Sequence, residues 1–94
     1  MVRMLMTINI SKGWETWSEM AKGLEPQMNE QGAKIIWAGA NPDETAVFVL
    51  AEMKDPSYVK TFGERPDIVA LREAAGADVA STKPLTQIDK YFLG

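Results

Sequence analysis

The order of secondary-structure signals along the chain predicts an α+β fold built on one four-stranded antiparallel sheet. Three observations support it: an alternating apolar start, an apolar stripe at helical spacing after it, and two β-rich runs joined by a polar turn. A second helical region and a final β-rich segment complete the order strand, helix, strand, strand, helix, strand. This is the ferredoxin-like βαββαβ arrangement, with both helices on one face of the sheet. The 94 residues are expected to form one domain, 1–94.

The first strand is expected from period-two spacing. One side of it carries Met4, Met6, Ile8 and Ile10. The residues between them, from Arg3 to Asn9, point to the other side. Ser11 follows the strand and is expected to cap a helix by accepting a hydrogen bond from a first-turn N–H.

The first helix is indicated by an apolar stripe at spacings of three and four residues. The stripe consists of Trp14, Trp17, Ala21, Leu24 and Met28. Pro26 is expected to kink or restart this helix near Glu25, because proline has no N–H to donate to the preceding turn. Gly32 is suited to end the helix in a left-handed conformation.

Residues 33–40 and 45–52 are two β-rich runs, and the turn sequence Asn-Pro-Asp-Glu of residues 41–44 separates them. They predict an antiparallel hairpin. Asp55 and Pro56 then read as a helix cap followed by proline at the first helical position, and Gly63 is expected to close that short helix.

The last third of the chain predicts one more helical segment and one strand. Pro66 is expected to open the helix and Gly76 to stop it. Its inward-facing residues are expected to be Ile68, Leu71 and Ala75. The final strand is expected over Leu85 to Leu93, because Pro84 limits pairing before that point.

The predicted hairpin is apolar on both faces. In its second run, Ala46, Phe48 and Leu50 form one face, and Val47, Val49 and Ala51 form the other. In its first run, Ile35 and Trp37 oppose Ile36 and Ala38. Two helices cover only one face of the sheet, and a bare second face would expose a contiguous apolar patch. A homodimer in which two sheets pack face to face, closing an α/β barrel, is therefore expected.

The composition excludes several classes of function. Histidine and cysteine are both absent, so disulfides, thiolate metal sites and a Ser-His-Asp hydrolase are excluded. A formal net charge of -3 and dispersed basic residues argue against nucleic-acid binding. The sequence has no apolar run near the ~20 residues that cross a bilayer, so no membrane association and a cytoplasmic location are expected. No metal or cofactor is implied.

The element order, the two-sided hairpin and the segment Ser-Lys-Gly-Trp-Glu-Thr-Trp of residues 11–17 resemble the dimeric α+β barrel superfamily. The resemblance spans essentially the whole chain and is closest in layout to small, uncharacterised bacterial members. The superfamily includes cofactor-independent monooxygenases, haem-degrading enzymes, small-lactone isomerases and members of no known activity. Its haem-degrading members pair an asparagine with a tryptophan and a histidine, and without histidine that branch is excluded. Fold alone does not choose among the others.

Five residues are candidates for a ligand site. The resemblance implies that Asn9 holds a substrate, as an asparagine on the first strand does in monooxygenase-like members; alternatively, Asn9 ends the strand. Trp17 and Trp37 are candidates to line a pocket for a flat ligand, with core packing as the alternative. Tyr58 and Arg65 are candidate polar anchors.

Arg72, beside Glu73 at a helix end, reads more simply as surface charge that favours the helix terminus.

Three functions remain open. The first is a dimeric protein that binds a small apolar or aromatic molecule between helices and sheet. The second is a cofactor-independent monooxygenase- or isomerase-like enzyme that positions its substrate. The third is a structural or assembly domain without a ligand.

Overall fold

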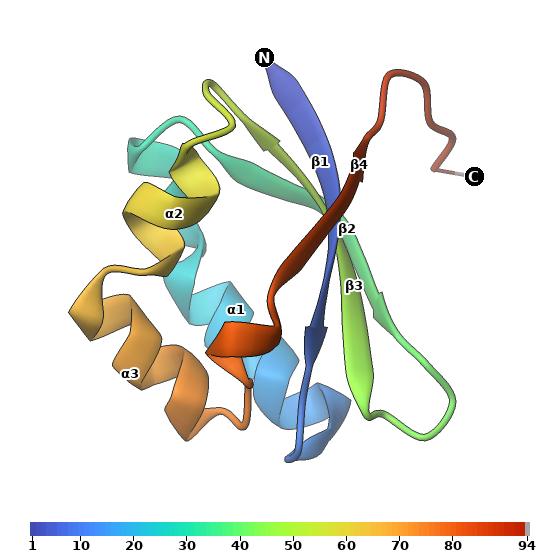
Figure 1. Cartoon of the computed structure of the whole chain (residues 1–94), viewed down its shortest axis with the longest axis vertical. Coiled ribbons are helices and arrows are strands. Elements are labelled where there is room, and N and C mark those ends of the chain that lie inside the picture. Colours follow the sequence, from blue (N-terminus) through green and yellow to red (C-terminus); the bar gives the residue numbers. More distant parts are fainter. Residues whose placement is uncertain (94) are drawn as a thin grey trace.

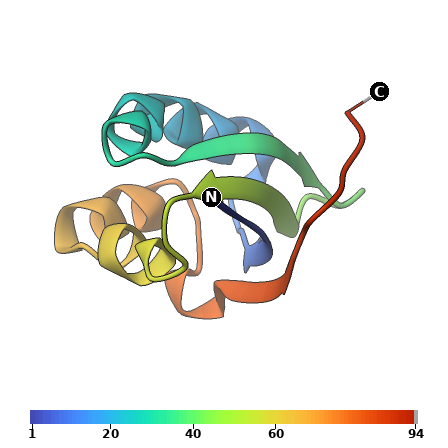
Figure 2. The same cartoon turned by 90° about the horizontal axis from the view of Figure 1, so that it is seen from above.

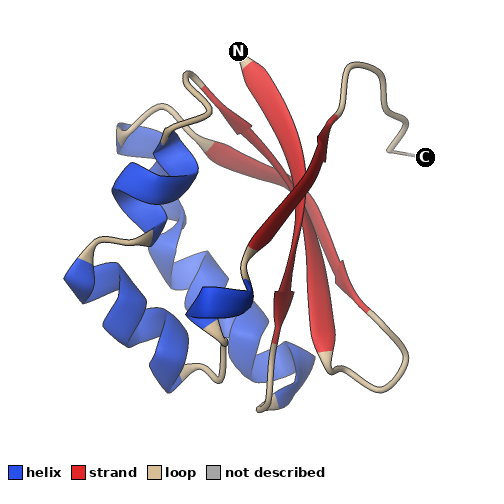
Figure 3. Ribbon diagram, viewed as in Figure 1, coloured by secondary structure: helices blue, strands red, loops and turns tan. Residues whose placement is uncertain are grey.

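The computed structural model describes residues 1–93 and has the expected α+β, ferredoxin-like layout (Figure 1, Figure 3). The elements are β1 (Val2–Asn9), α1 (Gly13–Glu30), β2 (Lys34–Ala40), β3 (Ala46–Met53), α2 (Tyr58–Gly63), α3 (Pro66–Ala74), the 3-10 turn η1 (Val79–Ser81) and β4 (Lys83–Gln87). The strands form one antiparallel sheet in the order β2-β3-β1-β4. The second helical region consists of two short helices, α2 and α3, as expected from Gly63 and Pro66, and residues 64–65 join them.

The helices lie together on one face of the sheet, and no helix lies on its other face, called here the outer face (Figure 2). The main core forms between α1 and the inner sides of the strands. It contains Met6 and Ile8 of β1, Trp17 of α1, and Val47 and Val49 of β3. A second cluster of Leu24, Phe62 and Ile68 packs α1 against α2 and α3.

The alternation predicted for the central strands is confirmed. β1 and β3 pair with Met6 opposite Val49 and Ile8 opposite Val47, and all four side chains are buried in the core. Leu50 is also buried but belongs to neither core cluster, because it lies on the outer face.

The alternation predicted for β2 is wrong at one residue. Ile35 pairs with Ala51 and Trp37 pairs with Leu50, so the register shifts at Ile36. This bulge puts Ile35 and Ala38 on the helix side and Trp37 on the outer face, because an extra residue reverses the alternation beyond it.

α1 carries the predicted apolar stripe, but its start and its proline differ from expectation. The hydroxyl of Ser11 donates to the carbonyl of Gly76 at 3.2 Å and caps nothing. The helix also runs unbroken through Pro26. Pro26 lies on the exposed side, where water can satisfy the carbonyl that the ring leaves without its helical partner. Gly32 has a φ of +80°, the left-handed conformation expected of it.

α2 begins at Tyr58, two residues later than expected. Asp55 Oδ1 accepts a hydrogen bond from the N–H of Ser57 at 2.8 Å, which makes a turn ahead of the helix. The Ser57 N–H holds the pKa of the Asp55 carboxyl below its usual value, because that hydrogen bond favours the ionised form.

α3 starts at Pro66 as expected, but one of its predicted inward residues is wrong. Ile68 and Ala75 are buried, whereas Leu71 is 47% exposed. Arg72, four residues after Ile68, takes the inward position instead. Gly76 ends the segment with a φ of +89°, as expected.

The last strand is shorter than expected and begins earlier, covering Lys83–Gln87 rather than 85–93. Pro84 lies within it, which is tolerated because β4 is an edge strand. Gln87 pairs with Met4 of β1, and the Ile88 N–H donates to the carbonyl of Arg3. Since β1 starts at Val2, residues 91–93 have no strand left to pair with.

Candidate functional site

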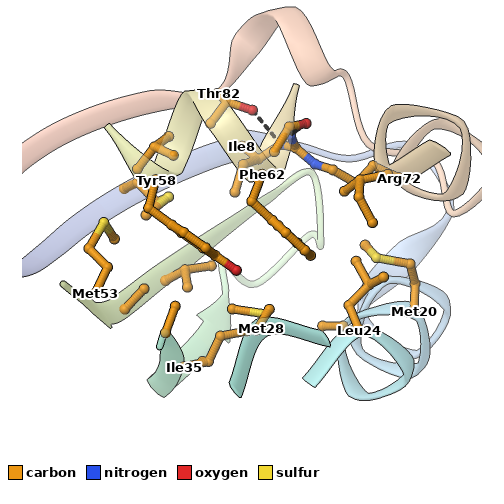
Figure 4. Close-up of a pocket in the computed structure, with 18 of the residues that line it drawn as sticks. Ile8, Met20, Leu24, Met28, Ile35, Met53, Tyr58, Phe62, Arg72 and Thr82 are labelled. Carbon is orange, nitrogen blue, oxygen red and sulfur yellow. Dashed lines mark hydrogen bonds between the residues drawn. The ribbon is translucent and has the colours of Figure 1, made fainter. Parts of the chain in front are cut away.

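A cavity of about 120 Å³ lies between the helices and the sheet (Figure 4). Its walls come from β1, α1, β2, β3, α2 and α3, so no single element forms it. Four of the six methionines of the chain line it: Met6, Met20, Met28 and Met53. Flexible thioether side chains let such a wall adapt to the shape of its contents.

The local patterns explain how these side chains reach the cavity. The apolar stripe of α1 contributes Trp17, Leu24 and Met28. Alternate residues of the strands, such as Ile8 and Val49, form the opposite wall. The cavity therefore occupies the interior of the fold, where the helix layer and the sheet do not fully fill the space between them.

Tyr58 brings a buried hydroxyl to this apolar wall. Its ring stacks on Phe62, one helical turn later, with 5.2 Å between ring centroids and 8° between planes. Figure 4 shows the hydroxyl directed toward the interior of the cavity, near Met28. Within residues 1–93 this oxygen has no hydrogen-bond partner. Burial raises the pKa of Tyr58, and the positive charge of Arg65 partly opposes that rise.

Arg72 is the second polar group of the wall, and its expected surface position is wrong. Its Nη1 donates to the carbonyl of Gly63 at 3.0 Å, and its Nη2 donates to the hydroxyl of Thr82. Burial lowers the pKa of Arg72, while the negative charge of Glu64 acts in the opposite direction. The group stays charged, because arginine keeps its proton in proteins. None of the ion pairs formed within residues 1–93 includes Arg72.

A sequence signal for Arg72 exists but is weak. Residues three and four positions after a buried helical residue lie on the same side of the helix as that residue. After Ile68 these positions hold Leu71 and Arg72, so both are candidates to face inward. Hydropathy favours the leucine as the inward-facing residue. Only the carbonyl of Gly63 and the hydroxyl of Thr82, supplied by other segments, make the arginine position the inner one.

Two of the five candidate residues lie in the cavity wall, Trp17 and Tyr58. Trp37 is not with them: it is 49% exposed on the outer face. Its indole lies over Gly39, with ring atoms 3.0 Å from the place that a Cβ there would occupy.

Arg65 and Asn9 also lie outside the cavity wall. Arg65 forms an ion pair with Asp67 at 2.8 Å and lies over the ring of Phe62. It also donates a hydrogen bond to the side-chain oxygen of Gln27, which joins α1 to the start of α3. Asn9 lines a separate, more open pocket of about 390 Å³, and its N–H donates to the hydroxyl of Ser81 at 2.9 Å. In the structure these two residues hold chain segments together.

The wall of the cavity offers hydrogen bonding, one positive charge and extensive apolar contact. The residues that line it include one phenol and one guanidinium and no carboxylate. Across residues 1–93, no group of three or more acidic, histidine or cysteine side chains gathers to hold a metal ion. Over the same residues, no helix has the length and apolarity needed to cross a membrane.

Comparisons of the chain with models of known protein families, with curated proteins and with solved structures gave no match. The ferredoxin-like layout thus stands on the structure itself. Membership of the dimeric α+β barrel superfamily stays a prediction from the sequence.

Proposed function

We propose that this protein binds a small, mainly apolar molecule in the cavity between its helices and its sheet. The observation that carries the proposal is the Tyr58 hydroxyl, which is buried against the cavity without a hydrogen-bond partner. A buried hydroxyl left in this state costs about 1–3 kcal/mol. A ligand with one polar atom would remove that cost and bury its apolar part against methionine and aromatic side chains.

The volume of the cavity limits the size of the ligand. At about 120 Å³ it is well below the roughly 300 Å³ at which pockets for drug-sized molecules begin. It is close to the ~150 Å³ of an engineered apolar cavity that binds benzene. A single ring or a short chain is therefore the expected ligand size.

The methionines provide the test. With methyl-¹³C-methionine, titration of benzyl alcohol is expected to shift the resonances of Met20 and Met28 saturably. Met1 and Met4, which do not line the cavity, serve as internal controls. Tyr58→Phe is expected to weaken binding about fivefold, since one neutral hydrogen bond contributes about 1 kcal/mol. Tyr91→Phe, at the only other tyrosine, is the matched control.

Two results would count against binding in the cavity. One is the absence of any saturable shift with benzyl alcohol, benzamide or benzoate. The other is a set of shifts that spreads equally over Met1, Met4 and the methionines of the wall.

We further propose that a second copy of the chain covers the outer face. Leu5, Trp37, Phe48 and Leu50 lie on that face, and no helix covers them (Figure 2). At its border Arg3 and Lys34 both lie within 4.0 Å of the Glu52 carboxylate, which offsets part of their positive charge. The centre of the outer face is apolar, so a self-complementary contact with an identical copy is expected.

Light scattering behind a sizing column tests the dimer. Wild-type protein is expected to have twice the mass of one chain at micromolar concentration. Phe48→Glu, which adds a charge to the centre of the outer face, is expected to give monomers. Leu71→Glu, at an exposed leucine away from the sheet, is expected to remain dimeric. A monomeric wild-type protein would overturn the dimer.

A further inference from the structure

Arg72 gives the cavity a positive charge that no carboxylate within residues 1–93 neutralises by direct contact. Its two hydrogen bonds go to neutral oxygens, those of Gly63 and Thr82. A guanidinium has five N–H groups, so three remain after these two bonds. Arg72 is half-buried, and a charge partly withdrawn from water costs free energy unless a counter-charge meets it.

The placement of Arg72 is unusual for a purely structural residue. Its neighbour Leu71 is 47% exposed, while Arg72 faces the apolar cavity. A core built only for stability would place the leucine inside and the arginine in water. The two hydrogen bonds hold the guanidinium from two directions, one from the end of α2 and one from the residue that precedes β4.

The rest of the wall shows what kind of anion fits. Apart from Arg72, the polar side chains that line the cavity are the hydroxyls of Tyr58 and Thr82 and the indole of Trp17. A phosphate would bring about two negative charges to one guanidinium. A carboxylate brings one, and its two oxygens match the planar fork of arginine.

We propose that the cavity selects a small monocarboxylate with an apolar body, of the size of benzoate or hexanoate. This inference rests on the proposed ligand-binding function and names its ligand class. The carboxylate lies beside Arg72, and the apolar body lies against Phe62 and the methionines.

The decisive experiment compares ligands of one shape and different charge on wild-type protein at pH 7. Calorimetric titration is expected to show that benzoate binds at least tenfold more tightly than benzamide. Benzylamine, which is cationic at this pH, is expected to bind most weakly. The wild-type comparison needs no substitution, so it holds even if an Arg72 variant fails to fold.

Variants then assign the preference to Arg72. In Arg72→Gln, benzoate and benzamide are expected to bind with affinities within about twofold of each other, while Arg72→Lys keeps part of the preference. Thr82→Val removes one neutral support of the guanidinium and is expected to reduce the preference without abolishing it. Lys60→Gln makes the same change of charge at an exposed position of α2 and is expected to keep the wild-type ratio.

The outcomes separate this inference from the function on which it rests. If benzamide binds as tightly as benzoate, with shifts confined to the methionines of the wall, the cavity binds ligands and the carboxylate preference is overturned. If none of the three probes binds and benzyl alcohol does not bind either, both proposals fail. A benzoate preference that survives in Arg72→Gln would overturn the role of Arg72.

Discussion

The carboxylate of Glu44 accepts a hydrogen bond from the backbone N–H of Trp14 at 2.7 Å. The turn between β2 and β3 thereby caps α1, a helix 30 residues earlier in the chain. Glu44 has a φ of +56°, a left-handed conformation that non-glycine residues adopt at a cost. The contact with Trp14 helps to offset that cost.

Removing this cap is expected to destabilise the protein. Glu44→Ala should lower the free energy of unfolding by about 1 kcal/mol, the usual effect of losing a helix N-cap. Glu44→Gln keeps an acceptor oxygen and should lose less. Urea denaturation followed by circular dichroism measures both. Glu19→Ala, at an exposed position of α1, is the control, and an equal loss there would contradict the capping role.

Ile68 is expected to control both stability and the size of the cavity. It is 1% exposed and lines the cavity wall. Ile68→Ala should lower the free energy of unfolding by about 2–5 kcal/mol, and Ile68→Val by about 0.5–1.5 kcal/mol. The enlarged cavity should also favour 2-naphthoate over benzoate in calorimetric titration. A Val variant as unstable as the Ala variant would show that lost volume is not the cause.

The buried hydroxyl of Tyr58 is expected to lose its proton at a higher pH than an exposed tyrosine. Burial raises its pKa above the ordinary value near 10, so the folded state holds this proton more tightly than the unfolded state. This difference in pKa contributes to the free energy of unfolding. The contribution is full below pH 10 and is lost as the pH rises through the folded-state pKa. Absorbance at 295 nm measures the midpoint in Tyr91→Phe, where Tyr58 is the only tyrosine. A midpoint equal to that of the same variant in urea would refute this prediction.

Gly39 is expected to set the position of the exposed tryptophan. A Cβ at this position would lie 3.0 Å from the indole of Trp37, so Gly39→Ala should shift the ring by a few tenths of an ångström. The tryptophan emission spectrum should change, and the proposed dimer should weaken, as sizing with light scattering would show. Gly23→Ala has free space for its Cβ and is the control. Unchanged emission in Gly39→Ala would contradict the close contact.

The predicted site was partly right, because hydropathy indicates the inward position of an apolar residue but not that of a charged one. Trp17 lies on the apolar stripe of α1, and that stripe alone places it inside. Arg72 is charged, and hydropathy places it outside. Its inward position depends on hydrogen bonds to Gly63 and Thr82, which a pattern along α3 does not contain.

The sequence by itself determined the order of the elements and the faces of most of them. Period-two alternation and an apolar stripe at spacings of three and four can be seen within a short stretch of sequence. These patterns were therefore enough to predict β1, α1 and the hairpin. Only the tertiary structure decided the cap of α1, the bulge in β2 and the end of β4. Each of these depends on a partner distant in the sequence: Glu44 for the cap, β3 for the bulge and the first residues of β1 for β4. Such partners meet only when the layers pack, because burial and hydrogen bonding across the sheet determine which groups lie side by side.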